Sequence, residues 1–178
     1  FWPGAVTRFA DGVTSATPLH HMRMPALPGL TLWEAFLWKP EGCIGEVSAL
    51  AVLLGGGWLL ARGVIHFAVP ASYLGTAAVL SLLVSHSQPP LLWMGYSLLC
   101  GGMLLGAFFM ATDYASSPVT PRGQILYGVG CGALTVLFRS VGIYPEGVTY
   151  AILLMNAAAG AVDRITLPRR FGRQEGET

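Results

Sequence analysis

A short run of small and polar residues near the start of the chain offers one side chain for chemistry. The run reads Asp11-Gly12-Val13-Thr14-Ser15-Ala16-Thr17-Pro18-Leu19, and its acid, glycine and hydroxyl groups are typical of a turn. The small side chains before Thr17 leave it accessible, and Pro18 biases Thr17 toward extended geometry. The spacing therefore predicts an exposed threonine hydroxyl on a loop, a feature that by itself is typical of many surface turns.

Two polar residues farther along are candidates for an ion path. Asp113 follows an apolar segment, where it either caps a helix end or belongs to an ion path or a docking loop. Asn156 lies inside another apolar segment, where an amide either forms a hydrogen bond between helices or binds an ion. The residue types alone leave both choices open for both positions.

Two further charged residues lie near the ends of apolar segments. Glu46 precedes the first segment, where an acid suits the positive N-terminus of a helix. Arg139 lies near the end of the fourth segment, where a long side chain commonly extends to the membrane interface. The alternative for Arg139 is pairing with Glu146 or with a phosphate group.

The cysteines and histidines lack the spacing of a metal site. Cys43, Cys100 and Cys131 are far apart and form no Cys-x-x-Cys pair. His20 and His21 have no partner set spaced around them, so we interpret them as solvated loop residues. The sequence therefore predicts no metal centre.

The composition is that of a membrane protein. Only 11% of the 178 residues are charged, whereas soluble domains carry about 25%. The mean hydropathy is +0.59, and the 23 glycines are typical of closely packed transmembrane helices. A net charge of +1 provides no basic field for nucleic acid. We expect an all-α polytopic protein that is embedded in lipid and has no nucleic-acid partner.

Five apolar segments approach the ~20 residues needed to cross a bilayer. They lie at about 47–60, 69–85, 91–111, 125–138 and 147–162. Gly55-Gly56-Gly57 interrupts the first segment, and Gly101-Gly102 interrupts the third. Glycine weakens a helix by up to ~1 kcal/mol relative to alanine. Each cluster therefore marks either close helix packing or a broken helix that lines a site.

The basic residues predict an orientation for these segments. With five spans, residues 62–67, residues 113–124 and the tail from Asp163 fall on one side of the membrane. Together they hold six of the ten Lys and Arg residues, so the positive-inside rule places that side in the cytoplasm.

This orientation divides the chain into three parts. Residues 1–46 form an extracytoplasmic segment that contains the threonine turn, residues 47–166 form the membrane domain, and residues 167–178 form a cytoplasmic tail. Aromatic side chains within about 31–39 predict an amphipathic helix that lies at the membrane interface.

The threonine turn resembles a flavinylation motif. In that motif, Asp-x-x-Ser/Thr-x-Ala-Thr, a flavin transferase joins FMN to the last threonine through a phosphoester bond. The matching residues are Asp11, Thr14, Ala16 and Thr17, with Ser15 at a variable position. Two families of membrane subunits carry such a motif, namely the B-type subunit of the sodium-pumping NADH:quinone reductase and the D-type subunit of the Rnf complex.

Other segments resemble the D-type subunit of the Rnf complex in particular. They are residues 104–113, 116–123, 139–148 with the letters YPEG, 151–156, and 168–172 with the letters PRRFG. The resemblance runs in order from Asp11 to Gly172 and corresponds to roughly the C-terminal half of the family's usual length. Because the chain begins Phe1-Trp2-Pro3-Gly4 without a Met, we expect more sequence to precede it.

The resemblance implies a redox subunit of the bacterial inner membrane. Rnf complexes pass electrons between ferredoxin and NAD and couple this transfer to movement of Na⁺ or H⁺. The resemblance also implies covalent FMN at Thr17, a noncovalent riboflavin in some members, other Rnf subunits as partners, and a flavin transferase during maturation. It further implies half of a urea-transporter-like inverted-repeat fold and activity only within the assembled enzyme, with no catalytic residue in this chain alone.

Two alternatives remain at this stage. The first is a passive solute channel of urea-transporter-like fold without flavin, for which the motif at Asp11 to Thr17 has no use. The second is a B-type protein of the quinone-reductase family, which has the same flavin chemistry with a different electron partner. The YPEG and PRRFG letters favour the Rnf family over that second alternative.

Overall fold

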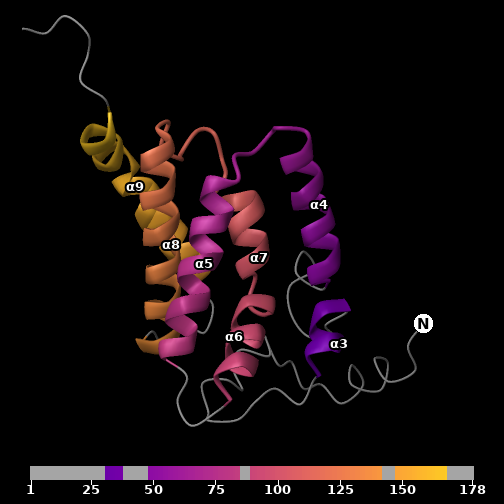
Figure 1. Cartoon of the computed structure of the whole chain (residues 1–178). Coiled ribbons are helices and arrows are strands. Elements are labelled where there is room, and N and C mark those ends of the chain that lie inside the picture. The colour runs from indigo at the N-terminus through magenta and orange to yellow at the C-terminus, as the bar shows by residue number, and fades with distance from the viewer. Residues whose placement is uncertain (1–30, 38–47, 85–88, 142–146, 168–178) are drawn as a thin grey trace, which may run out of the picture.

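The computed structural model describes residues 31–37, 48–84, 89–141 and 147–167. Within these ranges the chain forms helices and loops and contains no strand (Figure 1). The prediction of an all-α fold is therefore confirmed for the described part. The predicted flavinylation motif, Glu46, Glu146 and most of the cytoplasmic tail lie outside the described residues.

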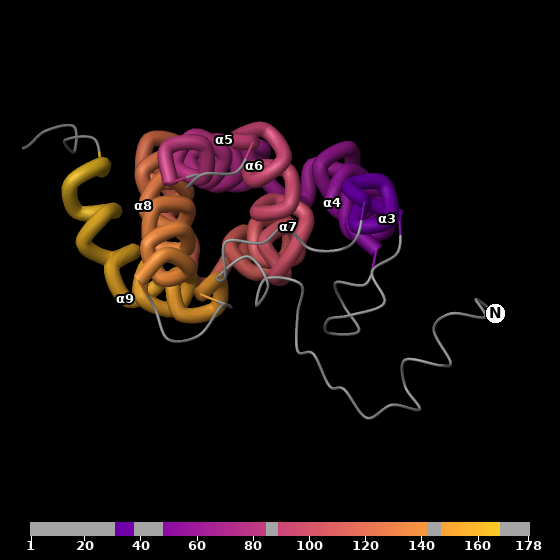
Figure 2. The backbone as a smooth tube through the Cα atoms, turned by 90° about the horizontal axis from the view of Figure 1, so that it is seen from below, coloured from indigo at the N-terminus to yellow at the C-terminus, as the bar shows by residue number. Residues whose placement is uncertain are grey.

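The described helices follow the predicted apolar segments closely. They are α3 (Leu32–Leu37), α4 (Ala49–Ala61), α5 (Ala68–Leu83), α6 (Pro90–Leu99), α7 (Met103–Leu105), the π-helical turn η2 (Gly106–Met110), α8 (Pro121–Val141) and α9 (Val148–Thr166). Seen along the bundle, α3 and α4 lie on one side, α8 and α9 lie on the other, and α6 and α7 lie between them (Figure 2).

Two of these helices are long and apolar enough to cross a bilayer alone, namely α8 with 21 residues and α9 with 19. The pair formed by α6 and the Met103–Met110 stretch passes the same criterion as one bent span. The helices α4 and α5 have only 13 and 16 residues, which at 1.5 Å per residue is ~20 and ~24 Å against a hydrocarbon core of about 30 Å. The structure thus supports two or three spans by length, where the sequence predicts about five.

The central contact of the bundle joins α5 to α8, and α9 packs on the other side of α8. Glycines on α8 allow this close approach, because a side chain at Gly132 would meet the Tyr73 carbonyl of α5 at 2.7 Å. A side chain at Gly128 would likewise meet Ser72 and the Val69 carbonyl. The main buried core lies here and includes Tyr73, Ala77, Met103, Tyr127 and Cys131.

The short helix α3 begins with a capping box at the position where an interfacial helix is predicted. The Thr31 amide donates to Glu34 Oε2 at 2.9 Å, and the Glu34 amide donates to Thr31 Oγ1 at 3.3 Å. These bonds also hold the pKa of Glu34 below its ordinary value. On the opposite face, Ala35 packs against Tyr96 of α6, so α3 lies against α6.

Three segments that are far apart in sequence lie together at one end of the bundle (Figure 1). The Tyr114 hydroxyl, which follows η2, donates to the Val64 carbonyl between α4 and α5 at 2.7 Å. The Val119 amide donates to Asp163 Oδ1 near the end of α9 at 3.1 Å. These are the segments that the distribution of basic residues predicts to share one side of the membrane.

Candidate functional site

The third predicted span is broken, and glycines make the break. Gly101 and Gly102 have φ values of +71° and +64°, a backbone region that residues with a Cβ rarely adopt. The helix α6 therefore ends at Leu99, α7 begins at Met103, and the two directions differ by 62°. Of the two interpretations of the Gly101-Gly102 pair, the broken helix is correct.

The glycine triplet in the first span marks close helix packing and not a break. The helix α4 runs without interruption from Ala49 to Ala61 through Gly55, Gly56 and Gly57. A Cβ at Gly56 would lie 2.5 Å from the Phe108 ring, and one at Gly55 would lie 3.2 Å from Phe109. Gly55 and Gly56 thus allow α4 to pack against η2, and the broken-helix interpretation is wrong for this span.

Arg139, in the last turn of α8, binds carbonyls of buried residues at the break. Its Nη1 donates to the Ser97 carbonyl at 2.6 Å and to Ser97 Oγ at 3.3 Å. Its Nη2 donates to the carbonyls of Cys100 at 3.1 Å and Gly101 at 3.0 Å. The observed partners of Arg139 are thus backbone carbonyls at the end of α6, which need donors. Its extension to the membrane interface stays a prediction, and so does pairing with Glu146, which lies outside the described residues.

Two buried pairs of hydroxyl groups lie near this arginine. Ser81 of α5 and Ser97 of α6 form a hydrogen bond of 3.0 Å. Tyr73 of α5 lies 2.7 Å from Thr135 Oγ1, which sits four residues before Arg139 on α8. Because the Thr135 proton is donated to the Cys131 carbonyl at 2.8 Å, the Tyr73 hydroxyl is the donor in its pair. These two pairs and Arg139 form a row of polar side chains within an otherwise apolar bundle, here called the polar seam. The seam ends at the break.

Asn156, a predicted ion-path residue, takes part in a hydrogen bond between helices. The hydroxyl of Tyr127 on α8 donates to Asn156 Oδ1 on α9. This contact is one of the two roles that the sequence allows for Asn156. A role in ion movement stays a prediction.

Replacing either partner is expected to weaken the contact between α8 and α9 modestly. Hydrogen bonds between membrane helices contribute about 0.6 kcal/mol on average, so the double-mutant cycle of Tyr127→Phe and Asn156→Leu should give a coupling energy of about that size. The measurement is the free energy of unfolding of the four proteins in mixed micelles. Strictly additive effects of the two substitutions would contradict this contact.

Asp113, the other predicted ion-path residue, is exposed and organises a turn after η2. Its carbonyl accepts hydrogen bonds from the amides of Ser116 at 3.4 Å and Ser117 at 3.0 Å. Its Oδ2 accepts a further bond from Ser116 Oγ at 3.1 Å. The observed contacts are those of a turn residue at a helix end, and the ion-path role again stays a prediction.

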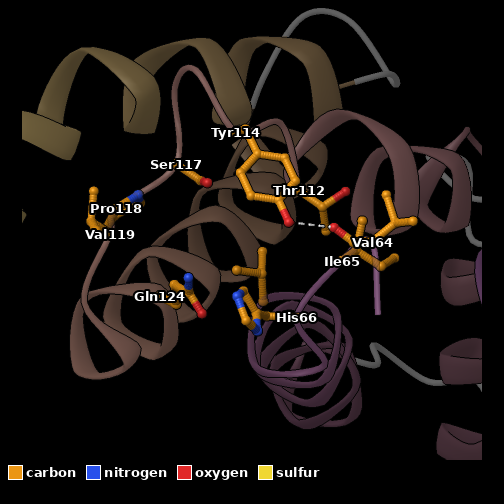
Figure 3. Close-up of a pocket in the computed structure, with 10 residues that line it drawn as sticks. Val64, Ile65, His66, Thr112, Tyr114, Ser117, Pro118, Val119 and Gln124 are labelled. Atoms are coloured by element: carbon orange, nitrogen blue, oxygen red, sulfur yellow. Dashed lines mark hydrogen bonds between the residues drawn. The ribbon is translucent and has the colours of Figure 1, made fainter. Parts of the chain in front are cut away.

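A pocket of about 150 Å³ lies at the same end of the bundle. Its walls come from the α4–α5 loop, the segment between η2 and α8, and the first turns of α5 and α8. They include His66, Tyr114, Ser117 and Gln124 (Figure 3). Sites for drug-sized ligands and cofactors enclose about 300–1,000 Å³. The pocket therefore has room for a few water molecules or a small ion and is too small for a flavin.

The described residues contain no cluster of three or more His, Cys, Asp or Glu side chains that would hold a metal ion. Cys100 and Cys131 are buried and pack among apolar neighbours, in accordance with their interpretation as small hydrophobic residues. The predicted attachment residues Asp11, Thr14, Ser15, Ala16 and Thr17 lie outside the described ranges, so their geometry stays a prediction.

The sequence alone does not predict the long-range hydrogen bonds of the polar seam. Tyr73 and Thr135 are 62 residues apart, and Ser97 and Arg139 are 42 apart. The available signal was a serine and an arginine within apolar segments, which membrane proteins seldom leave unbonded.

Comparison with known families adds a finding that covers almost the whole chain. A family model described as the NQR2, RnfD, RnfE family matches residues 1–172. The chain belongs to this family. The matched residues include the Asp11 to Thr17 motif, the Gly101-Gly102 break and Arg139, so the family model covers all three features.

Individual relatives agree on the D-type subunit. The chain is 46% identical to that subunit of the "Na(+)-translocating ferredoxin:NAD(+) oxidoreductase complex" of Acetobacterium woodii, over 96% of this chain and 54% of the relative. It is 41% identical to the same subunit of the "Ion-translocating oxidoreductase complex" of Stutzerimonas stutzeri, over 92% of this chain and 49% of the relative. It is 37% identical to the corresponding subunit of the "Proton-translocating ferredoxin:NAD(+) oxidoreductase complex" of Clostridium ljungdahlii, over 96% of this chain and 57% of the relative.

These matches confirm the resemblance to the Rnf D-type subunit that the segment letters predict. The chain spans about half the length of the curated relatives it matches. Together with the candidate spans, they also establish a membrane protein.

Proposed function

We propose that the chain is part of the D-type membrane subunit of an Rnf complex, which couples electron transfer between ferredoxin and NAD to movement of Na⁺ or H⁺. The observation that carries the proposal is the family match over residues 1–172, which contains an intact Asp11 to Thr17 motif. The names of the relatives support the activity of the complex. The chain acts only within the assembly, together with the other Rnf subunits.

The cofactor of this proposal is FMN, joined through its phosphate to the Thr17 hydroxyl by a separate flavin transferase. A hydroxyl that follows the small side chain of Ala16 suits a phosphoester, because it provides an oxygen with little steric hindrance. When bound, the flavin supplies the redox chemistry, and the protein determines where it is held. A second, noncovalent riboflavin belongs to the proposal, and the 150 Å³ pocket is too small to hold it.

The proposed topology places the five apolar segments in the bacterial inner membrane. The end of the bundle at which Val64 meets Tyr114 and Val119 meets Asp163 faces the cytoplasm, because the basic residues concentrate there. Residues 1–46 then lie outside the cytoplasm with Thr17, and α3 lies at that interface. The 62° break in the third span supports a urea-transporter-like fold with discontinuous helices.

The test is in-gel flavin fluorescence of the denatured protein, purified from cells that produce the whole complex. We expect the fluorescent band to disappear in Thr17→Ala and to remain in the control Thr7→Ala, a threonine outside the motif. Denaturation removes noncovalent flavin, so the remaining fluorescence reports only the covalent group. A Thr17→Ala protein with full fluorescence would contradict the assignment.

A passive solute conduit of the same fold remains the second candidate. The discontinuous α6–α7 pair favours it, because broken helices line substrate sites in transporters. Solute uptake by proteoliposomes in the absence of any electron donor would support the conduit. A requirement for the motif at Thr17 would exclude it, since a conduit has no use for a tethered flavin.

A further inference from the structure

The break between α6 and α7 presents a cluster of oxygen atoms. The carbonyls of Ser97, Cys100 and Gly101 and the Ser97 hydroxyl all lie within 2.6–3.3 Å of the Arg139 guanidinium nitrogens. Ser81 Oγ joins the cluster through its hydrogen bond to Ser97. Carbonyl and hydroxyl oxygens are the ligands that hard cations such as Na⁺ prefer, and unwound carbonyls at half-helix ends bind Na⁺ in transporters.

The electrostatics of the break also favour a cation. The C-terminus of a helix carries a partial charge of about −0.5, and the end of α6 at Leu99 lies at the break. In the observed structure the guanidinium of Arg139, in the last turn of α8, supplies the positive charge beside this end.

We propose that the oxygen cluster at the break is a monovalent cation site, and that Arg139 acts as an internal cation that competes for the same oxygens. With the guanidinium bound, the site is closed to ions. Movement of Arg139 away from the Ser97, Cys100 and Gly101 carbonyls opens the site to Na⁺. The inference deepens the ion-translocating part of the proposed function, on which it rests, and does not depend on the flavin.

The test measures the thermal stability of the detergent-solubilised complex in NaCl and in N-methyl-D-glucamine chloride at equal ionic strength. In Arg139→Gln the oxygens lose their resident cation and recruit Na⁺, so we expect the Tm to rise by at least ~3 °C between about 1 and 100 mM Na⁺. In the wild type and in Arg139→Lys, a tethered cation remains and the Tm should not depend on Na⁺. The matched control is Arg164→Gln, which removes an exposed arginine from the last turn of α9.

Each outcome decides the proposal. An assembled Arg139→Gln complex whose Tm is the same in both salts would overturn it, and so would Na⁺ dependence in the Arg164→Gln control. If Arg139→Gln fails to assemble, the lysine variant decides: assembly near wild-type yield supports the need for a cation, and failure of both variants refutes it. Repeating the titration on a protein with both Arg139→Gln and Thr17→Ala separates this inference from the flavin assignment, because the Na⁺ response of Arg139→Gln should be the same without flavin.

Discussion

The assembled complex that carries Thr17→Ala should lose ferredoxin-dependent NAD reduction, with activity falling to that of membranes that lack this subunit altogether. In the proposed function, covalently bound FMN is a fixed redox centre, and removing its attachment oxygen would interrupt the path of the electrons. The measurement is NAD reduction by washed membranes with reduced ferredoxin as donor. The variant changes only one small side chain in a predicted turn, so the assembly itself should form.

The control for this prediction is Thr7→Ala, which should keep wild-type activity and FMN content. The amount of the subunit is measured by immunoblot in the same membranes, which separates loss of a redox station from loss of the complex. Wild-type rates of NAD reduction in membranes with a full amount of the Thr17→Ala protein would contradict the assigned role of the flavin.

The substitution Gly132→Ala should break the packing of α5 on α8 and lower the yield of folded protein sharply. A Cβ at this position would lie 2.7 Å from the Tyr73 carbonyl oxygen and 3.2 Å from the Ala77 amide nitrogen. Both are backbone atoms and cannot move aside as a flexible side chain does. Overpacking of this kind costs about 1–3 kcal/mol, and the shift would also separate Tyr73 from Thr135. The measurement is the free energy of unfolding in mixed micelles.

Gly160→Ala provides the matched control. This glycine lies on α9, and among the described residues no atom outside its own stretch of helix lies within 4 Å of the position of an added Cβ. Here alanine favours the helix by up to ~1 kcal/mol, so the stability should stay the same or rise. Equal effects of the two substitutions would show that the close contact between α5 and α8 does not determine the stability of the bundle.

Hydrophobic runs predicted the helices well because a helix in lipid must satisfy its own backbone hydrogen bonds. All five predicted apolar segments correspond to helices in the described residues. The bounds of α4 and α5 also agree with the predicted 47–60 and 69–85 to within about two residues. The helices α8 and α9 extend by three or four residues beyond the predicted 125–138 and 147–162. Apolar runs do not show these extensions, because the added residues include polar ones such as Arg122, Ser140 and Arg164.

The two glycine clusters show why local sequence could not distinguish a break from a packing site. Gly101 and Gly102 adopt positive φ, whereas Gly56 lies in a continuous helix against Phe108. The difference depends on contacts made by distant residues. At the break, Arg139 binds carbonyls 38 to 42 positions earlier in the chain and stabilises the interrupted helix. The flavinylation motif is a different case. Its residue types alone indicate only a surface turn, and the prediction of FMN at Thr17 depends on the resemblance to a family.

The most direct test of the flavin assignment is mass spectrometry of the native protein, on the tryptic peptide from Phe9 to Arg23. We predict a mass increase equal to FMN minus one water, because a phosphoester forms with loss of water, and fragmentation should place the group on Thr17. An unmodified peptide from a complex that still transfers electrons at its full rate would contradict the account.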